Sequence, residues 1–240
     1  YPAPNAEHLF DVELGYQYTG NNWYAGTNFY YMGYKDQFVQ TGEQSDIGEN
    51  LTTNVKDSYR MGAELSAGWN ATSWFTLEGN AALSINKIKD FNEFVDNWDN
   101  KKNPLKVHYD NSTLAFSPSA ILNGFMNFHY KGAQLVWHTN FVSRQYLDNS
   151  ENKDRSLPAF SQSDINLSYA LKTGNKQNWL KEMVFGLNFN NIFNSHYAAS
   201  GWVYSAVSGK YKYTNDKRYY QIGFMPMAGF TMMGNVTLRF

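Results

Sequence analysis

The sequence predicts an all-β protein that forms a portion of an antiparallel transmembrane β-barrel. Apolar and polar residues alternate along many segments, as in FTMMGNVTLRF at residues 230–240, and this period of two is typical of strands with one apolar face. The connections between these segments alternate between short and long, and tryptophans gather beside the short ones. Because only every second residue of a membrane strand faces lipid, a mean hydropathy of -0.56 is compatible with such a barrel.

About nine strands are expected along the chain. They span residues 9–18, 23–35, 57–68, 74–87, 117–130, 133–146, 162–172, 181–193 and 229–240. Short connections lie at 19–22, 69–73, 131–132 and 173–180, and long polar ones at 36–56, 88–116, 147–161 and 194–228. Outer-membrane barrels have short periplasmic turns and long extracellular loops, whereas a soluble sandwich has no reason to keep that alternation.

Turn chemistry predicts how three hairpins pair. A two-residue turn in TGNN pairs Tyr18 with Trp23, one in YKGA pairs Phe128 with Leu135, and a longer turn across NATS aligns Ala67 with Leu77. In each hairpin the apolar side chains then share one face and mostly polar side chains share the other. The three hairpins therefore agree on one apolar and one polar face of the sheet.

Aromatic residues cluster at one end of the expected strands. Those beside the short connections are Trp23, Trp69, Trp74 and Trp179, together with Tyr18 and Tyr130. Aromatic belts mark the interfaces of membrane barrels, so this cluster predicts the periplasmic interface. The alternative is that these residues are core aromatics of a half-buried sheet, and their position at strand ends rather than mid-strand argues against it.

Composition excludes several other classes of protein. The net charge of -1 gives no sign of a nucleic-acid partner, and the chain lacks the long apolar runs of a helical membrane protein. The absence of cysteine excludes disulfide scaffolds and thiolate metal sites. The chain starts at Tyr1 without a Met or a signal peptide, so a processed or truncated beginning is expected.

Several stretches resemble the TonB-dependent outer-membrane receptors. FGLNFNNIFNSHY is similar to the penultimate barrel strand of that family, and the matching positions are Asn190, Asn191, Ile192, Phe193, Asn194 and Tyr197. PNAEHLFDVELGYQY resembles the stretch that enters a middle strand, with Glu13, Leu14 and Gly15 matching a Glu-Leu-Gly pattern. YYMGYKDQ and NVKDSYRMGAELSAGW resemble the next two strands. The order and spacing of these motifs extend the resemblance across nearly the whole chain.

The resemblance implies the domain organisation. The family pattern has an N-terminal plug domain, a short box that engages TonB and a barrel of about twenty-two strands. Nothing in the chain resembles the plug or the box, so residues 1–240 are expected to be the C-terminal portion of such a barrel, from a fragment or a split chain. Its first and last strands, near residues 10–18 and 230–240, would leave unpaired edges, and the chain is not expected to close a barrel by itself.

The resemblance also implies location, partners and function. The protein is expected in the bacterial outer membrane, in contact with its lipid, with the remaining upstream strands and plug of the same receptor, and with TonB through that plug. Its function would be TonB-dependent uptake of a scarce nutrient, foremost a ferric siderophore or another iron complex. The alternatives are a passive or adhesive outer-membrane barrel without a plug, and a soluble carbohydrate-binding β-protein, which solubility without detergent would favour.

The last strand carries a predicted assembly signal. A final strand with alternating apolar residues and a terminal aromatic is read by the barrel-assembly machinery in outer-membrane barrels, and MMGNVTLRF looks like it. The residues assigned to this signal are Val236, Leu238 and Phe240. Phe240 is expected at the periplasmic interface.

No catalytic residues, enzyme activity, metal site or cofactor are predicted. The histidines, His8, His108, His129, His138 and His196, lack metal-ligand spacing. His138 is expected to share the polar face with Phe125 inside the barrel, and His8 is only a loose candidate for haem recognition. The acidic stretch DFNEFVDNWDNKKN lacks the spacing of a calcium loop and is expected to be solvated.

Ligand capture is expected in the long loops. The stretch GWVYSAVSGKYKYTNDKRYYQ combines rigid aromatic rings with cations, which suits an anionic ligand such as a ferric siderophore. The candidate ligand-binding residues are Trp98, Arg144, Trp202, Tyr204, Tyr211, Tyr213 and Arg218. The alternative is that these aromatics only pack an extracellular β-hairpin extension.

Overall fold

The structure, a computed structural model, describes residues 4–44, 49–100, 103–173, 179–210 and 217–240. Its strands are β1 (His8–Thr19), β2 (Trp23–Gln44), β3 (Asn50–Thr72), β4 (Phe75–Asn97), β5 (Leu105–Thr113), β6 (Ala120–Tyr130), β7 (Ala133–Val142), β8 (Gln145–Tyr146), β9 (Ser156–Leu157), β10 (Phe160–Lys172), β11 (Glu182–Asn190), β12 (Ala198–Val207), β13 (Tyr219–Pro226) and β14 (Thr231–Arg239). A short 3-10 helix, η1 (Lys153–Arg155), precedes β9. No helix in the described ranges is long and apolar enough to span a membrane.

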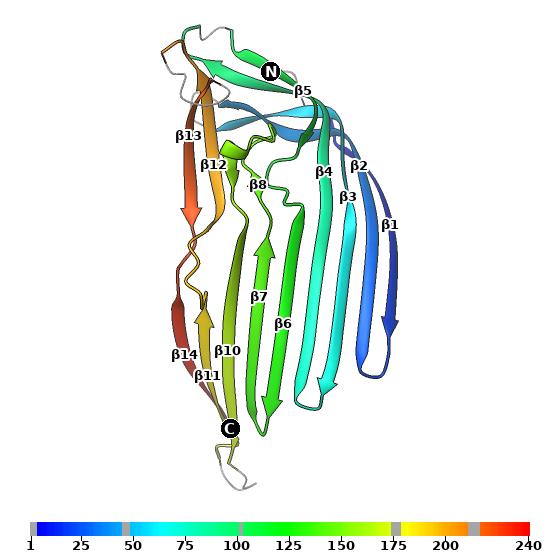
Figure 1. Cartoon of the computed structure of the whole chain (residues 1–240), viewed down its shortest axis with the longest axis vertical. Helices are drawn as coiled ribbons and strands as arrows, with labels where there is room; N and C mark the ends of the chain where they lie inside the picture. The colour runs from blue at the N-terminus through cyan, green and yellow to red at the C-terminus, as the bar shows by residue number, and fades with distance from the viewer. Residues whose placement is uncertain (1–3, 45–48, 101–102, 174–178, 211–216) are drawn as a thin grey trace.

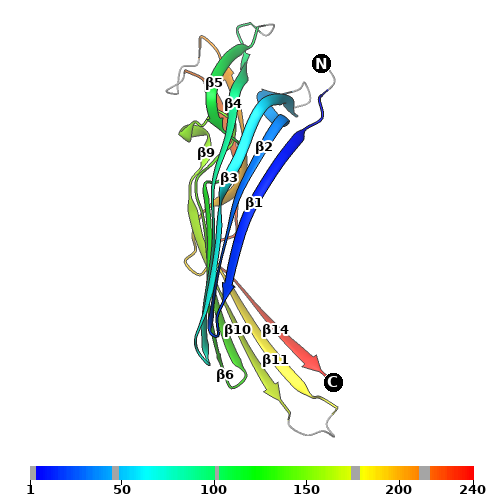
Figure 2. The same ribbon diagram turned by 90° about the vertical axis from the view of Figure 1, so that its right-hand side faces the viewer.

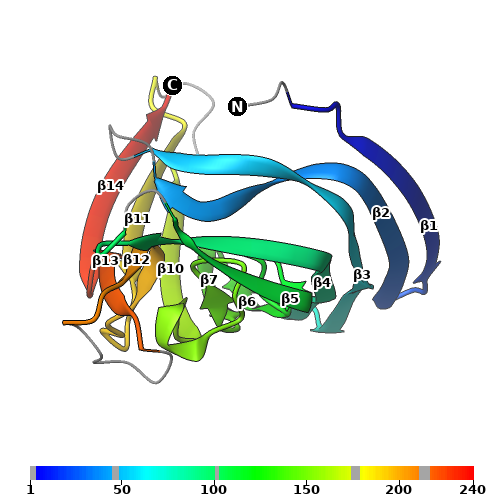
Figure 3. The ribbon, with the colours of Figure 1, turned by 90° about the horizontal axis from the view of Figure 1, so that it is seen from above.

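Nine of these strands form a single antiparallel wall in the order β1-β2-β3-β4-β6-β7-β10-β11-β14. They correspond one to one with the nine expected strands, so the predicted fold class is confirmed. Seen from above, the wall is curved, with β1 and β14 at its two ends (Figure 3). Within the described residues β1 and β14 pair only with β2 and β11, so the chain does not close a barrel by itself, as expected.

The wall has one apolar and one polar face because side chains alternate along each strand. On the apolar face, apolar residues of adjacent strands pair directly with one another. One such row runs across four strands and consists of Phe128, Leu135, Leu167 and Leu187. On the opposite face the side-chain amide of Asn123 donates to Asn80 at 3.0 Å and accepts from Asn140 at 3.0 Å. Polar groups on that face therefore satisfy one another across strands.

The register of one hairpin is confirmed and two are wrong by two residues. Lys131 and Gly132 both have positive φ, 46° and 85°, which forms the tight turn that pairs Phe128 with Leu135. In the first hairpin Tyr18 pairs with Ala25 rather than Trp23, because Gly20 N donates to Trp23 O at 2.8 Å and closes a longer turn.

The hairpin of β3 and β4 is displaced in the same way. Ala67 pairs with Gly79 rather than Leu77, and the register is irregular between Asn70 and Thr72. A displacement of two residues returns every side chain to its original face, since the period of a strand is two. The predicted apolar and polar faces are therefore correct even where the partners are not.

The short turns lie at the bottom of Figure 1, and the residues of the aromatic cluster stand in these turns or beside them in the sequence. Trp23 and Trp69 are cross-strand partners, and the Trp179 ring stacks on Phe240 at 4.9 Å between centroids. Both pairs are exposed on the surface. The predicted position of these aromatics at one end of the strands is confirmed.

Three of the four expected long loops are largely β-hairpins. The strands β2 and β3 continue to Gln44 and from Asn50, β4 continues to Asn97 and pairs with β5, and β12 pairs with β13. These hairpins lie at the end of the wall opposite to the short turns (Figure 2). The stretches 36–56, 88–116 and 194–228, expected as long polar connections, therefore contain strands in their described residues, and β12 and β13 form a β-hairpin extension of the wall.

Candidate functional site: the loop cap

The described residues of the long connections, which span 36–56, 88–116, 147–161 and 194–228, form a structure that we call the loop cap. At its top β4 and β12 pair as parallel strands, with Asp96 opposite Ala206, and Trp98 N donates to Val207 O at 3.0 Å. Figure 1 shows β4 and β5 reaching the upper end of β12 and β13. Two hairpins that rise from different parts of the wall are thus joined by main-chain hydrogen bonds.

A buried ionic cluster lies beneath this junction. Glu93, whose side chain is 3% exposed, accepts a hydrogen bond from Arg218 Nη1 at 2.8 Å. The Arg155 guanidinium lies 3.6 Å from the same carboxylate and 2.7 Å from Asp148 Oδ2, and it packs over the Tyr220 ring at 5.0 Å. Three of the four cap segments therefore contribute a charged group to one buried site.

The cluster neutralises charges that burial would otherwise make costly. Tyr109 OH donates to Glu93 Oε2 at 2.9 Å, and burial together with the Glu93 charge raises the pKa of this phenol. Burial also raises the pKa of Asp148, against the opposing effect of the Arg155 charge. The charges of the two guanidinium groups and the two carboxylates balance one another, so the cluster holds the cap segments together.

An asparagine links the remaining segment to the others. Asn149 Nδ2 donates to the carbonyl of Gln40 at 3.0 Å, and Asn149 Oδ1 accepts from Ala115 N at 2.8 Å. A small hollow of about 130 Å³ lies beside these contacts, lined by groups that include Glu93, Asp148 and Trp202. All four cap segments therefore belong to one connected body.

Two of the candidate ligand-binding residues meet at the tip of the cap. Trp98 Nε1 donates to Tyr204 OH at 3.0 Å, and Tyr204 OH donates to Asp96 Oδ2 at 2.8 Å. The Tyr219 ring lies 5.0 Å from that of Trp98. Burial, followed by the hydrogen bond to Asp96, raises the pKa of Tyr204 to about 12. We call Trp98, Tyr204 and Tyr219 the aromatic triplet.

The other candidates lie in different surroundings. Trp202 is exposed, and its indole covers Gly223, where an added Cβ would lie 2.1 Å from the indole nitrogen. Arg144 Nη1 donates to Ser156 Oγ at 2.6 Å. Arg218 belongs to the buried ionic cluster and is only 4% exposed. Tyr211 and Tyr213 lie outside the described residues.

The sequence reasoning missed Glu93 and Arg155. The expectation that DFNEFVDNWDNKKN is solvated is wrong for Glu93, which lies between Phe91 and Val95 on one buried face of β4. In this alternation, apolar residues stand two positions before and two positions after the carboxylate. Such a pattern indicates a buried charge that is paired with an opposite charge. Arg155 stands in the polar stretch ENKDRS, which offers no comparable signal.

On the polar face of the wall His138 and Phe125 lie together as expected. Their rings stack at 4.4 Å between centroids, and His138 also lies 3.8 Å from Asp164 and 3.2 Å from Asn123 Oδ1. In the described ranges no group of three or more His, Cys, Asp or Glu side chains could hold a metal ion. The surroundings of His138 are those of a packed side chain.

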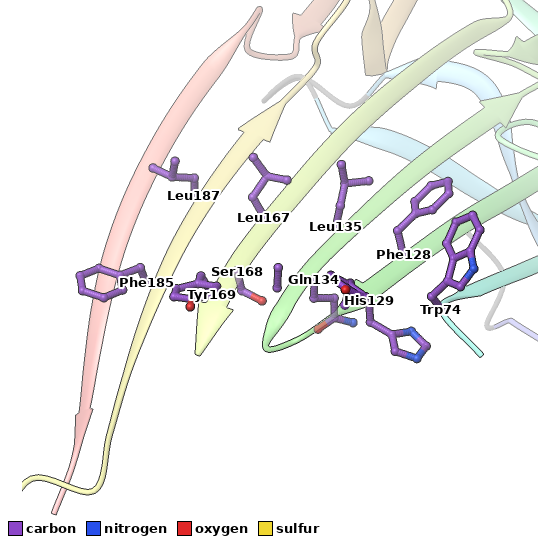
Figure 4. Close-up of a pocket in the computed structure, with 12 residues that line it drawn as sticks. Trp74, Phe128, His129, Gln134, Leu135, Leu167, Ser168, Tyr169, Phe185 and Leu187 are labelled. Carbon is purple, nitrogen blue, oxygen red and sulfur yellow. The ribbon is translucent and has the colours of Figure 1, made fainter. Parts of the chain in front are cut away.

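The apolar face carries a shallow hollow of about 640 Å³ near the short turns (Figure 4). Leu135, Leu167 and Leu187 line it at one level, and Trp74 and Tyr169 line it nearer the turns. Such a surface matches hydrocarbon rather than a polar ligand. Farther along the same face, the residues of the predicted assembly signal occupy the edge strand, where Val236 pairs with Phe185 and Leu238 with Met183.

Comparisons with known proteins give one family match and several solved structures with a similar fold. The family model described as "TonB dependent receptor-like, beta-barrel" matches residues 1–194. Similar solved structures include the copper transporter OprC, with a TM-score of 0.63 and 17% identity over 96% of this chain and 30% of that chain. The ferric yersiniabactin uptake receptor FyuA from Yersinia pestis has a TM-score of 0.60 and 15% identity over 98% and 30%.

A third solved structure, the FrpB iron transporter from Neisseria meningitidis, has a TM-score of 0.57 and 15% identity over 97% of this chain and 31% of that chain. Identities this low describe a common fold. This chain spans 30% or 31% of the length of the three structures. No curated protein matches the sequence.

Proposed function

This chain belongs to the TonB dependent receptor-like β-barrel family of the bacterial outer membrane, and we propose that it supplies part of the wall and the loop cap of a nutrient uptake receptor. Members of the family are transporters rather than enzymes, in line with the expectation from the sequence. The substrate that we propose is a ferric siderophore or another iron complex. Membership of this family is incompatible with the soluble carbohydrate-binding alternative.

The observation that carries this proposal is the aromatic triplet at the tip of the loop cap. Trp98 remains 40% exposed while its indole is held by Tyr204, so it offers a rigid surface to an incoming ligand. Rigid aromatic rings supply contact area with little loss of conformational entropy. We assign ligand contact to Trp98, Tyr204, Trp202 and Arg144, and we assign to Arg218 the positioning of the cap through Glu93.

The names of proteins that share the fold support an iron complex as the proposed substrate. The ferric yersiniabactin receptor and the FrpB iron transporter are named for iron, and OprC for copper. A siderophore complex is large, so it requires several exposed contacts, and the cap presents Trp98 and Trp202 on β4 and β12 or at their ends. The proposal that this chain binds an iron complex rests on that likeness and on the aromatic surface together.

The remaining partners follow from the open wall. The edges of β1 and β14 carry main-chain groups that cannot remain unpaired in hydrocarbon. We propose that residues 1–240 form the C-terminal portion of the barrel, that further strands of the receptor cover these edges, and that a plug outside this chain connects the receptor to TonB. We also propose that the barrel-assembly machinery recognises Val236, Leu238 and Phe240.

Equilibrium binding of siderophores loaded with radioactive iron to the full-length receptor tests the proposal. Trp98→Ala should weaken binding about tenfold or more, since truncation of an aromatic anchor at a binding surface typically has that effect. Trp179→Ala is the matched control, because Trp179 is an exposed tryptophan at the opposite end of the wall and should leave affinity unchanged.

Uptake by cells completes the test. Iron uptake through the receptor should stop when TonB is deleted. Uptake that continues without TonB would identify a passive barrel, and failure of every tested iron complex to bind, with copper bound instead, would overturn the choice of substrate.

A further inference from the structure

The apolar face of the wall ends, toward the loop cap, at a row of polar and charged residues. Direct cross-strand partners on four adjacent strands make up this row, and they are His8, Lys35, Asp57 and Lys89. The row one step nearer the short turns contains Phe10, Gly33, Tyr59 and Lys87, and the next contains Val12, Tyr31, Met61 and Ile85. Because alternate residues share a face, all three rows lie on the lipid-facing side.

A hollow of about 310 Å³ lies between these rows. The Tyr31 and Tyr59 rings line it and stack at 6.3 Å between centroids, and an added Cβ at Gly33 would lie 3.2 Å from the Tyr31 ring. Lys35, Asp57 and Lys89 line it from the charged row, which we call its rim. The hollow therefore combines aromatic rings with a rim that carries two lysines.

Two of the lysines are available to an anion. Lys89 Nζ lies 5.7 Å from the centroid of the Tyr59 ring, and neither Lys35 nor Lys89 forms an ion pair within the described ranges. Lys87 differs from them, because its ammonium is 2.8 Å from Glu151. The strands that carry Lys35 and Lys89 have β3 between them, which places their backbones about 10 Å apart, a span that suits a phosphate group with its sugar.

We propose that this hollow binds the phosphate-bearing headgroup of a lipid in the outer leaflet of the membrane. Its position supports this choice, because the family lies in the outer membrane and the cap marks the extracellular end of the wall. Lysine ammonium groups at the boundary of an apolar surface recognise anionic lipid headgroups. The acyl chains would lie along Phe10, Tyr31 and Met61, below the charged row.

Asp57 gives the site a preference for a phosphorylated lipid over free phosphate. Its carboxylate stands between Lys35 and Lys89 in the register and repels any anion at the rim. A phosphorylated lipid offsets that repulsion by burying its acyl chains against the apolar rows, whereas inorganic phosphate has no such contribution. The site lies on the outer surface of the wall, so it is independent of the transported nutrient and goes beyond the proposed function.

Binding of diphosphorylated lipid A in detergent micelles to the purified full-length protein tests this site. The double variant Lys35→Gln/Lys89→Gln should bind the lipid about 20- to 30-fold more weakly, given the usual contribution of a lysine near an anionic lipid surface. Lys56→Gln/Lys106→Gln removes the same charge from exposed positions outside the hollow and should leave the affinity unchanged.

Two further measurements distinguish binding of the lipid from binding of free phosphate or general attraction to positive charge. Asp57→Asn should tighten lipid binding, and inorganic phosphate up to millimolar concentration should not compete. Equal loss of lipid affinity in the two double variants, or full competition by inorganic phosphate, would overturn the proposal. Siderophore affinity of the Lys35→Gln/Lys89→Gln protein should equal that of the wild type, which keeps this test separate from that of the transport function.

Discussion

Arg218 donates a hydrogen bond to Glu93 over 2.8 Å, although 125 residues separate the two in the sequence. Both side chains are almost fully buried, and Arg155 approaches the same carboxylate from a third segment. A buried charge that loses its partner is strongly destabilising. The integrity of the loop cap therefore depends on one carboxylate that faces two guanidinium groups.

Glu93→Gln should loosen the loop cap without opening the wall. The substitution removes the carboxylate charge that the buried Arg218 and Arg155 guanidinium groups share, so we expect a loss of about 3–5 kcal/mol of local stability. Hydrogen exchange of amides in β5, β12 and β13 of the full-length protein measures this loss. Glu151→Gln is the control, since its pair with Lys87 is partly exposed and contributes about 0–1 kcal/mol. Equal exchange in both variants would contradict the role of the cluster.

The contact between Tyr204 and Asp96 should weaken in alkaline solution. Because the folded protein raises the pKa of this phenol to about 12, the stabilisation is fully present below the ordinary tyrosine pKa of about 10 and is lost as the pH rises through about 12. Absorbance of tyrosinate across this range should show late-titrating phenols, among them Tyr204. The amplitude of that late component should fall in Tyr204→Phe, and an unchanged amplitude would assign the component to other tyrosines.

Leu187→Lys should destabilise the barrel more than Asn188→Lys. Leu187 is exposed on the apolar face and pairs with Leu167, whereas Asn188 points to the polar face. A lysine that faces hydrocarbon near the midplane costs about 2–4 kcal/mol, and one that faces the interior costs much less. Folding of the full-length protein into lipid vesicles, followed by denaturant titration, gives both values. An equal loss of stability in the two variants would contradict the assignment of Leu187 to the lipid-facing side and of Asn188 to the interior.

Phe240→Asp should reduce the amount of receptor in the outer membrane. The Phe240 ring stacks on Trp179, and its carbonyl accepts a hydrogen bond from Lys181 Nζ at 3.1 Å, so the change affects both the assembly signal and a contact at the turn end. Trp179→Ala removes the same ring contact and keeps the terminal aromatic. Surface abundance should fall for Phe240→Asp and remain for Trp179→Ala, while ligand affinity of the inserted molecules stays unchanged. A normal abundance of the Phe240→Asp protein would argue against the signal.

The wall was predictable because a period of two is a local property of the sequence. Turn chemistry settled the register only at Lys131 and Gly132, where both positive φ values match the expected turn. At Gly20 the same reasoning chose a turn two residues too short, since alternation alone cannot distinguish registers that differ by two. The alternation of apolar and polar residues was enough to assign each side chain to a face of the wall. The cross-strand partner of each residue depended in addition on the length of each turn.

The loop cap was less predictable because its contacts join distant segments. Trp98 and Tyr204 were selected for their residue types, yet their hydrogen bond depends on the parallel pairing of β4 with β12, which no local pattern encodes. Arg218 was selected as a cation for a ligand, and its burial against Glu93 depends on a segment far away in the sequence. Only Glu93 carried a local signal, in its alternation with Phe91 and Val95.

The parallel pairing of β4 and β12 has a consequence for the order of folding. Wall strands can form one after another, because each wall strand pairs with the next wall strand along the chain. The contact of Tyr204 with Asp96 instead closes a segment of 108 residues, and contacts of such long range form slowly because the chain entropy must be lost first. We therefore expect the cap to form after the wall, so a molecule whose wall is incomplete should also lack the junction of β4 with β12 and the hydrogen bond of Trp98 with Tyr204.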